Sequence, residues 1–289
     1  RSQYQQLCQE LAETVDVAAV MGHRADRLGY AFYGAYEAAL HQLFPQLPPE
    51  HSAALCVTEE TGNHPKAIHT TLAATQQGYS LTGHKKWITL ANQAQVLFVA
   101  AQTAEGLSLV RVETSCTGVE LEPMTQTPFV PEIRHFFVKF NDIPLGEDAL
   151  LDKDGWRDYI KPFRTIEDIH VLAAFLGYLL GEGARQDWPR PLIAEALNLV
   201  FAVRELAQMK PSASETHIRL EGCFQSVQRL IEALPWCDKD AQQRFERDRP
   251  LLNIAGWARK KRFAKALEEL DQMEVTRSTA LASRPRSRE

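Results

Sequence analysis

The chain has 289 residues, of which 45% are hydrophobic and 24% charged, and it carries a net charge of −5 at pH 7. This length allows one large domain or two to three small ones, and the composition is that of a globular protein with a core of normal size. The acidic balance argues against a nucleic-acid partner, because proteins that bind nucleic acid usually carry a basic patch or have a high pI.

The cysteines and the apolar runs bear on the compartment. Five cysteines occur at wide spacings without a CxxC pair, which indicates free thiols in a reducing cytoplasm and argues against disulfides or a zinc site. The longest apolar run, near residues 171–180, is too short to span a bilayer and contains Gly177. We therefore predict a cytoplasmic protein without a membrane span or a bound metal.

Residues 1–54 have a helical pattern. Leu7, Leu11 and Val15 recur at a spacing of four, and a second run rich in alanine, leucine and aromatic residues follows. A proline-rich stretch over residues 45–49 ends that run, as proline commonly does. The pattern predicts a short N-terminal helical region.

Residues 55–150 have a different pattern. Residues 96–101, 107–113 and 136–140 alternate or are rich in strand-forming side chains, and glycines separate these short runs. Short strands with turn signals about every ten residues are typical of a barrel or a sandwich. We predict a central antiparallel β-barrel or sandwich here.

The helical pattern returns after Trp156. Prolines separate four runs, for which we predict helices near residues 156–184, 191–209, 213–234 and 241–271. Short connections between consecutive helices imply antiparallel neighbours, so a C-terminal four-helix bundle is expected over residues 151–272. Residues 273–289 are rich in serine, arginine and proline and are expected to form a disordered tail. The whole chain is thus predicted to have an α+β fold.

Three short segments carry a resemblance to a known family. They are residues 56–59 (CVTE), residues 68–73 (IHTTLA) and residues 78–89 (GYSLTGHKKWIT). These segments resemble, in the same order, the V/L-T-E, I-x-T-x-A and G-Y-x-L-N-G-x-K-x-W-I-T signatures of the acyl-CoA dehydrogenases. The succession of a helical, a β and a four-helix region is also that of this family. The resemblance identifies the chain as a shortened, divergent member.

The resemblance implies a flavoprotein that binds FAD. In the family, the W-I-T strand lies against the flavin ring, and the threonine of V-T-E binds the polar edge of the ring. A flat apolar wall with a few fixed hydrogen-bond donors suits a flavin. An arginine beyond the first bundle helix helps to hold the adenine half across a subunit interface. By resemblance, the cofactor-binding residues are Val57, Thr58, Trp87, Ile88, Thr89 and Arg185.

Two departures from the family bear on the cofactor. Residues 60–65 (ETGNHP) replace a glycine-rich loop that ends in Gly-Ser-Asp, and Glu60 adds negative charge where a pyrophosphate would approach. Residues 185–191 (RQDWPRP) lack the Phe-Gly that follows the arginine in the family. Retention of the flavin and its loss are therefore both open, and FAD is expected to bind weakly if it binds.

One carboxylate stands where a branch of the family carries its catalytic base. Glu167 lies ten residues before Gly177 on the first predicted bundle helix, and a base at this position would remove the α-proton of an acyl thioester. Asp168 follows it, where the family normally has arginine. Catalysis by Glu167 and an exposed acidic turn formed by Glu167 and Asp168 are both open interpretations.

Three functional interpretations follow from these residues. The first is an acyl-CoA dehydrogenase-like oxidoreductase that acts on the CH–CH group of an acyl-CoA or a carrier-bound acyl thioester, with low activity and an electron-transfer acceptor. The second is a non-catalytic relative that serves as a binding or assembly subunit, and the third is a flavin enzyme with another substrate. A homodimer or a tetramer is expected. The basic cluster at residues 259–262 is interpreted as the solvated face of a helix.

Overall fold

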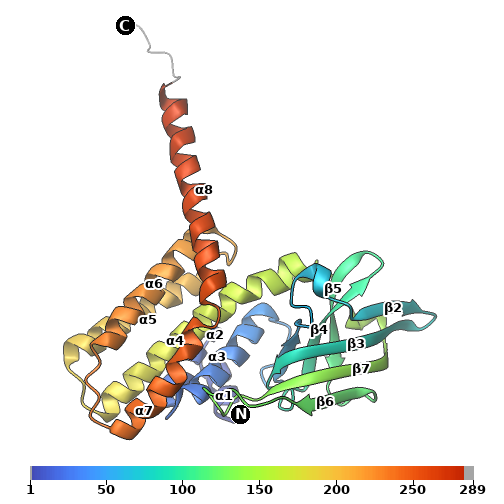
Figure 1. The fold of residues 1–289 in the computed structure, drawn as a ribbon, viewed down its shortest axis with the longest axis horizontal. Coiled ribbons are helices and arrows are strands. Elements are labelled where there is room, and N and C mark those ends of the chain that lie inside the picture. The colour runs from blue at the N-terminus through green and yellow to red at the C-terminus, as the bar shows by residue number, and fades with distance from the viewer. Residues whose placement is uncertain (1, 283–289) are drawn as a thin grey trace.

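The computed structural model describes residues 2–282, which form a helical part and a β part (Figure 1). Three helices come first: α1 (Ser2–Glu10), α2 (Thr14–Arg24) and α3 (Leu28–Leu43). A curled sheet follows, and the chain then returns to the helical part, where α4 packs against α2 and α3. The predicted α+β fold with N-terminal helices, a central sheet and C-terminal helices is confirmed.

The central sheet has seven strands in the order β1-β4-β2-β3-β7-β6, with β5 paired to β4. Most neighbours are antiparallel, including the β2–β3 hairpin, but β4 runs parallel to β1 and to β2. The sheet that we predicted as antiparallel therefore contains parallel pairings of β4. The strands are β1 (Ala53–Cys56), β2 (Thr71–Thr75), β3 (Gly78–Thr89), β4 (Val96–Thr103), β5 (Gly106–Glu113), β6 (Val119–Pro123) and β7 (His135–Leu145).

Strand β3 has an irregularity near its end. Its pairing with β7 shifts register between Lys85 and Ile88, and Trp87 within this shift has a φ of 60°. Positive φ is rare for a large side chain, and a bulge that re-aims one residue is a common reason for it. At this bulge Trp87 is turned towards solvent while Ile88 stays in the core.

The C-terminal part begins with a π-helical turn, Gly155–Ile160, that leads directly into the 25-residue helix α4 (Lys161–Arg185). The next two helices have the predicted positions. The helices that follow α4 are α5 (Arg190–Gln208), α6 (Ser214–Glu232), α7 (Lys239–Asp248) and α8 (Gly256–Ala282).

The helix predicted over residues 241–271 is divided into α7 and α8. A 3-10 segment that contains Pro250 lies between them, because a proline inside a helix removes a backbone donor and clashes with the preceding turn. Helix α8 starts beside α6 and then projects away from the rest of the chain (Figure 1). It ends at Ala282, so the backbone of the first part of the expected tail is helical, and residues 283–289 lie outside the described residues.

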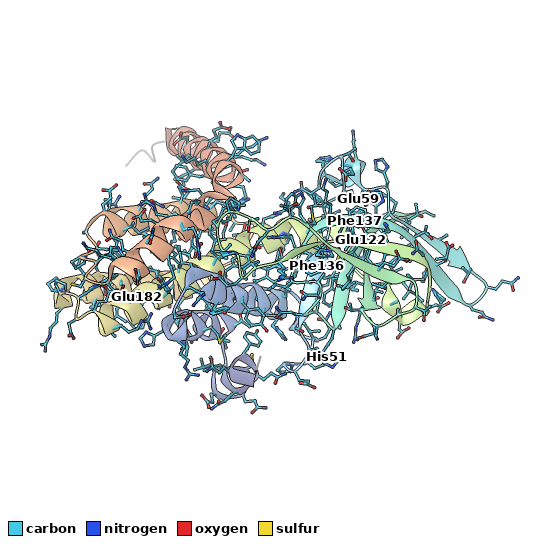
Figure 2. The ribbon with its side chains drawn as sticks, turned by 60° about the horizontal axis from the view of Figure 1, so that its bottom comes forward. His51, Glu59, Glu122, Phe136, Phe137 and Glu182 are labelled. Carbon is cyan, nitrogen blue, oxygen red and sulfur yellow. The ribbon has the colours of Figure 1, made fainter. Side chains whose placement is uncertain are left out.

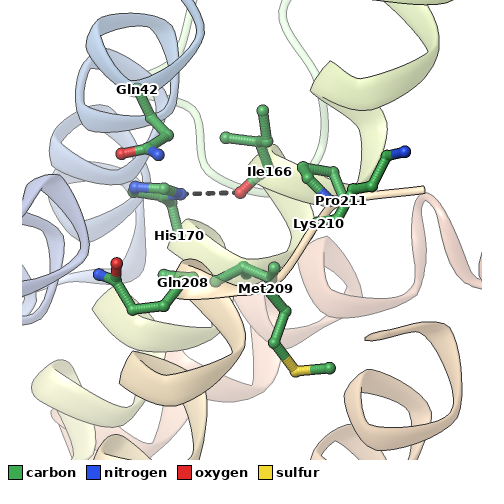
Figure 3. A pocket seen from close by; sticks show the side chains of 9 residues that line it. Gln42, Ile166, His170, Gln208, Met209, Lys210 and Pro211 are labelled. Carbon is green, nitrogen blue, oxygen red and sulfur yellow. Dashed lines mark hydrogen bonds between the residues drawn. The ribbon is translucent and has the colours of Figure 1, made fainter. Parts of the chain in front are cut away.

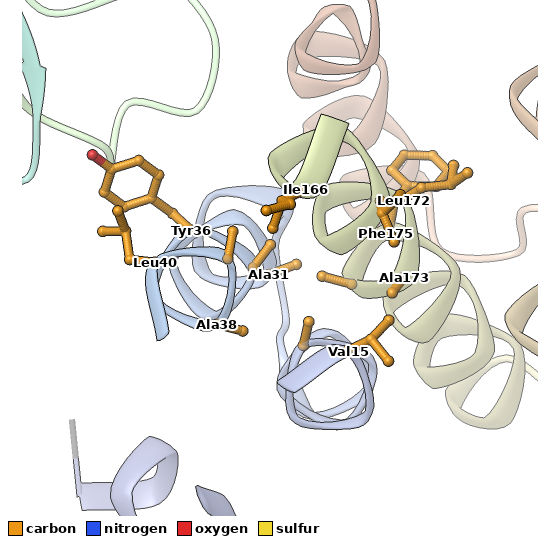
Figure 4. Packing of buried hydrophobic residues seen from close by; sticks show 14 of the residues in the cluster. Val15, Ala31, Tyr36, Ala38, Leu40, Ile166, Leu172, Ala173 and Phe175 are labelled. Atoms are coloured by element: carbon orange, nitrogen blue, oxygen red, sulfur yellow. The ribbon is translucent and has the colours of Figure 1, made fainter. Parts of the chain in front are cut away.

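The N-terminal helices and α4 form the centre of the helical core (Figure 4). Buried side chains of the three helices, among them Val15, Tyr36 and Phe175, pack together there. A glycine allows α2 to approach α4 closely, since a Cβ on Gly22 would lie 1.9 Å from the carbonyl oxygen of Ala174. A second buried cluster fills the interior of the sheet, while the first cluster also includes strand residues such as Phe98 and Leu109 and so joins the two parts.

Candidate functional site

The signature segments form a buried polar cluster. The Glu59 carboxylate accepts hydrogen bonds from Lys85 Nζ at 2.7 Å and from the Thr70 hydroxyl at 2.8 Å. It also accepts the backbone N–H groups of His69 and Thr70, at 2.7 and 3.0 Å. Burial would raise the pKa of Glu59, but the hydrogen bond and the charge of Lys85 lower it below its ordinary value. The three signature residues thus fasten the end of β1 to β2 and β3, a role that the sequence did not reveal.

Strands β3 and β7 present an outward face at their paired ends. Thr89 is the register partner of His135, and the Trp87 indole makes an edge-to-face contact with the His135 ring at 5.8 Å between centroids. Trp87 is 47% exposed, and Thr89 and His135 are half-buried. Because neighbouring residues of a strand face opposite ways, Ile88 and Phe136 point into the core. We call the face formed by Trp87, Thr89 and His135 the β3 surface.

The end of β1 reaches the edge of the β3 surface. The Thr58 carbonyl oxygen accepts the N–H of Lys86 at 2.7 Å, which sets Thr58 beside the residue that precedes Trp87. Among the described residues, none forms a hydrogen bond with the hydroxyls of Thr58 or Thr89, and both side chains are half-buried. Val57, in contrast, is 6% exposed and packs in the helical core. Of the predicted ring contacts, Val57 and Ile88 therefore do not present their side chains at this surface.

Glu167 lies on the second turn of α4, near α3 and β1. Burial raises the pKa of Tyr36 on α3, and the nearby charge of Glu167 raises it further, while the Tyr36 hydroxyl accepts the N–H of Leu55 in β1 at 3.1 Å. Burial also raises the pKa of Glu167, to about 7; Arg164 opposes this shift and Asp168 adds to it. Within residues 2–282, no hydrogen bond or ion pair to the Glu167 carboxylate is formed. A carboxyl group of this kind can both bind and release a proton near neutral pH.

Asp168 faces α8 and is paired with two of its arginines. Arg262 Nη2 lies 2.7 Å and Arg259 Nη1 3.6 Å from the Asp168 carboxylate. Arg259 also bonds Glu221 of α6 at 3.2 Å and stacks on the Phe224 ring at 3.4 Å. The predicted solvated basic face is therefore wrong for Arg259 and Arg262, which turn inward because they neutralise carboxylates of α4 and α6. Asp168 is 7% exposed, so the two acidic residues do not form an exposed turn.

Arg185, the predicted adenine contact, lies far from the β3 surface in the same chain. It ends α4, and the helical rise sets it roughly 27 Å along the axis from Glu167. Its guanidinium bonds the Glu182 carboxylate at 2.8 Å and the Ala25 carbonyl oxygen at 2.9 Å. Figure 2 shows Glu182 in the helical part, at the opposite end of the molecule from Glu59. One chain thus does not bring Arg185 together with the other predicted site residues.

Two cavities open on the helical part, and neither is lined by the β3 surface. The first, of about 350 Å³, lies between α3, the second and third turns of α4 and the α5–α6 connection (Figure 3). His170 in its wall donates from Nδ1 to the Ile166 carbonyl oxygen at 2.8 Å, and burial lowers the pKa of His170 to about 4, so the ring is neutral at pH 7. The second, of about 750 Å³, lies between α2, the end of α4 and the start of α5, where Trp188 and Leu197 line it.

A membrane-spanning helix, a cluster of metal ligands and a disulfide are absent from the described part of the chain. None of its helices is both long and apolar enough to cross a bilayer. No three histidine, cysteine or acidic side chains within residues 2–282 gather as metal ligands. The five cysteines are all free thiols.

The middle of the chain matches a known family. Residues 54–143, which contain the three signature segments, match the family model described as the acyl-CoA dehydrogenase middle domain. No curated protein matches the chain. The sheet and its signature residues are therefore similar to the middle domain of the acyl-CoA dehydrogenases.

Solved structures share the fold over most of the chain. Butyryl-CoA dehydrogenase from Megasphaera elsdenii has a TM-score of 0.65 at 14% identity, covering 86% of this chain and 80% of that one. FkbI, described as serving biosynthesis of a methoxymalonyl extender unit, has a TM-score of 0.66 at 13% identity, with 90% and 83% covered. PigA with FAD and proline has a TM-score of 0.65 at 16% identity, with 89% and 82% covered. The chain thus matches the acyl-CoA dehydrogenase middle domain over residues 54–143 and shares the fold of these structures over most of its length.

The matched family implies FAD as the cofactor. The β3 surface of this chain fits the flavin half of FAD. The β3 surface offers a half-exposed indole, Trp87, and two uncommitted hydroxyls, which suit a flavin ring. The groups expected near the phosphates and adenine are engaged elsewhere: the Gly62 N–H bonds the Glu59 carbonyl oxygen at 3.1 Å, and Glu60 pairs with Lys86 at 2.9 Å. Together with the internal contacts of the predicted adenine-binding arginine, these bonds leave the dinucleotide half without a prepared site.

Proposed function

We propose that the protein is an acyl-CoA dehydrogenase-like oxidoreductase in which Glu167 removes a proton from Cα of an acyl thioester. The observation that carries this proposal is the setting of Glu167. Its carboxyl group is without an ion-pair partner among the described residues, burial raises its pKa to about 7, and it lies near β1, whose end reaches the β3 surface. A base with such a pKa is suited to proton abstraction at neutral pH.

The residues of the site have distinct roles in this proposal. Glu167 takes up the α-proton and holds it within a poorly hydrated environment. The Thr58 hydroxyl would hydrogen-bond the polar edge of the flavin ring, the Thr89 hydroxyl would approach its reactive nitrogen, and the Trp87 indole would flank the ring. When bound, FAD supplies the acceptor for the hydride that leaves Cβ.

We further propose that FAD binds weakly. A charge-assisted hydrogen bond contributes about 1.5–3 kcal/mol, so the absence of several such contacts to the phosphates weakens binding by orders of magnitude. Trp87→Ala should abolish the remaining affinity, because the indole supplies most of the flat apolar contact at the β3 surface. Fluorescence titration of FAD against both forms measures this, and tightly held, stoichiometric FAD in the purified protein would contradict the proposal.

The partners follow from the same resemblance. An acyl-CoA or a carrier-bound acyl thioester would be the substrate, and an electron-transfer protein would be the acceptor in a cytoplasmic setting. Because Arg185 and the β3 surface of one chain are far apart, a second copy of the chain in a homodimer or tetramer would be needed to supply contacts to both halves of one FAD.

The catalytic role is tested by Glu167→Gln, which keeps shape and hydrogen bonding while it removes the base. We expect acyl-CoA oxidation, measured with a panel of acyl-CoAs and an artificial electron acceptor, to be low in the parent and lost in this variant. Glu195→Gln on the exposed face of α5 is the matched control and should keep the parent rate. Equal turnover in parent and Glu167→Gln would eliminate Glu167 as the base.

A non-catalytic binding or assembly subunit is the second candidate. The observation that favours it is the internal use of groups near the expected adenine site: Gln186 accepts the N–H groups of Cys237 and Asp238 at 3.0 Å each, and Trp188 is buried against Trp236. A purified protein without a flavin spectrum, and without flavin uptake on titration, would favour this candidate over the enzyme.

A further inference from the structure

Helix α4 carries two adjacent carboxyl groups with different surroundings. Consecutive helical residues point about 100° apart, so one turn of α4 directs Glu167 and Asp168 to different neighbours. Asp168 meets Arg262 at 2.7 Å and Arg259 at 3.6 Å on α8. Glu167 has no such partner in the described part of the chain. Burial opposes ionisation of both groups, and only Asp168 has cations in contact to offset it.

The charged and polar groups around this pair come from four helices: α3, α4, α6 and α8. On α4 itself, Arg164 acts on both carboxyls, and α3 contributes the neutral hydroxyl of Tyr36. Helix α6 contributes Glu221, and its His217 lies within the field of Lys161 and Arg262. Asp168 is therefore compensated from α8 by both the charge of Arg259, which Glu221 shares, and the charge and short hydrogen bond of Arg262.

Two neighbouring carboxyls titrate as a coupled pair, because a charge on one raises the cost of a charge on the other. The group with cationic partners ionises first, and the other then holds its proton to higher pH. In agreement, the pKa of Asp168 is raised by burial to about 6, and that of Glu167 to about 7. Environments that separate two such groups assign the roles of acid and base.

We propose that the docking of α8 onto α4 decides which of the two carboxyls carries their proton near neutral pH. With Arg259 and Arg262 in place, Asp168 ionises first as the pH rises, and Glu167 keeps its proton to higher pH. When α8 is displaced, Asp168 becomes the protonated member and Glu167 ionises at lower pH. The two arginines are thus positioning residues that act on Glu167 through Asp168, and only the catalytic consequence rests on the proposed function.

The test is a carboxyl ¹³C NMR titration of the full chain labelled at glutamate and aspartate. The Glu167 signal is assigned by its loss in Glu167→Gln, and the Asp168 signal by its loss in Asp168→Asn. In Arg262→Met we expect the pH midpoint of the Glu167 titration to fall and that of the Asp168 titration to rise. Asp168→Asn should also lower the Glu167 midpoint, and Arg262→Met should add nothing further in the double variant. Arg262→Lys, which keeps the charge, should retain the parent order.

Two results would overturn the proposal. A rise of the Glu167 midpoint in Arg262→Met would mean direct loss of a cation rather than action through Asp168, and an unchanged Glu167 midpoint in Asp168→Asn would mean no coupling. Lys261→Met, at an exposed position of the same helix, is the control and should leave both midpoints in place. If Arg262→Met does not fold, as judged by circular dichroism, Asp168→Asn and Arg262→Lys still test whether Glu167 is coupled to Asp168 and whether the charge at position 262 sets the order of titration.

The outcome is separable from that of the proposed enzyme activity. The titration reads protonation without turnover, so expected shifts in an inactive protein would support the coupling and refute the enzyme. In an active protein, the rising limb of the pH profile should move to lower pH in Arg262→Met, since Glu167 must be ionised to act as a base. If Arg262→Met kept the parent order of the Glu167 and Asp168 titration midpoints while its pH–rate profile changed, the pH effect would belong to another group. That result would overturn the role of Arg262.

Discussion

At Lys85 a charged group is fully buried, and Glu59 is the anion that meets it. Removal of one member of a buried pair leaves the other charge uncompensated, which typically destabilises a protein by about 3–5 kcal/mol. We therefore expect Lys85→Met to lower the free energy of unfolding by this amount, measured by urea denaturation. The double variant Glu59→Gln/Lys85→Met should recover part of it.

Lys86→Met is the matched control, because Lys86 is the next residue and pairs with Glu60 at the surface. Exposed ion pairs contribute about 1 kcal/mol or less, so this variant should stay close to the parent. Equal losses in Lys85→Met and Lys86→Met would show that the buried pair is not what fastens the signature segments.

His170 predicts a pH dependence of stability. Burial lowers its folded-state pKa to about 4 from an ordinary 6.5, so the unfolded chain binds more protons between these values. Stability from this group is complete above about pH 6.5 and is lost as the pH falls towards 4, by roughly 3 kcal/mol in all. His170→Gln should flatten that part of the curve in urea denaturation at several pH values. His23→Gln, on the exposed end of α2, is the control, and an unchanged slope in His170→Gln would contradict the assignment.

The site residues that the sequence predicts correctly are those that lie within a family signature. The W-I-T segment located Trp87 and Thr89, which share the β3 surface. His135 joins them through strand pairing, from 46 positions further along the chain than Thr89, and its sequence neighbours give no signal of this. The inward position of the α8 arginines is equally invisible in the sequence, because their carboxylate partners lie on two other helices.

Helices α2 and α4 approach each other closely at glycines. This close approach predicts that replacing such a glycine by alanine lowers the stability of the protein. A Cβ on Gly177 would lie 2.0 Å from the carbonyl oxygen of Ala19, which cannot move away without shifting α2. Gly177→Ala should therefore destabilise the protein by about 1–3 kcal/mol, although alanine favours helix by about 1 kcal/mol. Thermal and urea unfolding measure the change.

Gly222 on α6 is the matched control for Gly177. It also lies within a helix, but nothing lies within 4 Å of a Cβ built on it. Gly222→Ala should therefore stabilise the protein by about 0.5–1 kcal/mol through helix propensity alone. A loss of stability at both positions would show that the α2–α4 approach is not the deciding factor.

Elements followed from periodicity wherever one face of a helix or strand is buried. The change of pattern near residues 55 and 156 marks the start of the sheet and of α4 closely. The break at Pro250 was missed because the apolar spacing continues across it. The bulge at Trp87 was missed because it depends on the partner strand, β7, and the parallel pairing of β1 with β4 depends on the path of the whole sheet.

Large apolar side chains are exposed on several helices of the described residues, most strongly on α5 and α8. Phe201 on α5 is 61% exposed and Trp257 on α8 is 77% exposed. Exposed apolar area of this kind favours association, so we expect a dimer or tetramer by light scattering at micromolar concentration. Phe201→Glu should shift the equilibrium towards monomer, and Asn198→Glu, which adds the same charge to α5 without removing apolar area, should not. A monomeric parent would contradict the expectation.

The contacts of α4 with α2 and α3 have a consequence for folding during synthesis on the ribosome. The first helices are synthesised early, but their glycine-lined partner is completed about 140 residues later, after the entire sheet. At 5–20 residues per second, the apolar faces of α2 and α3 stay uncovered by α4 for about 7–28 s. During that interval the sheet can close on its own separate core, whereas the helical part cannot. Codon-dependent pauses between residues 44 and 160 would therefore lengthen the time in which the nascent chain is open to aggregation or to chaperones.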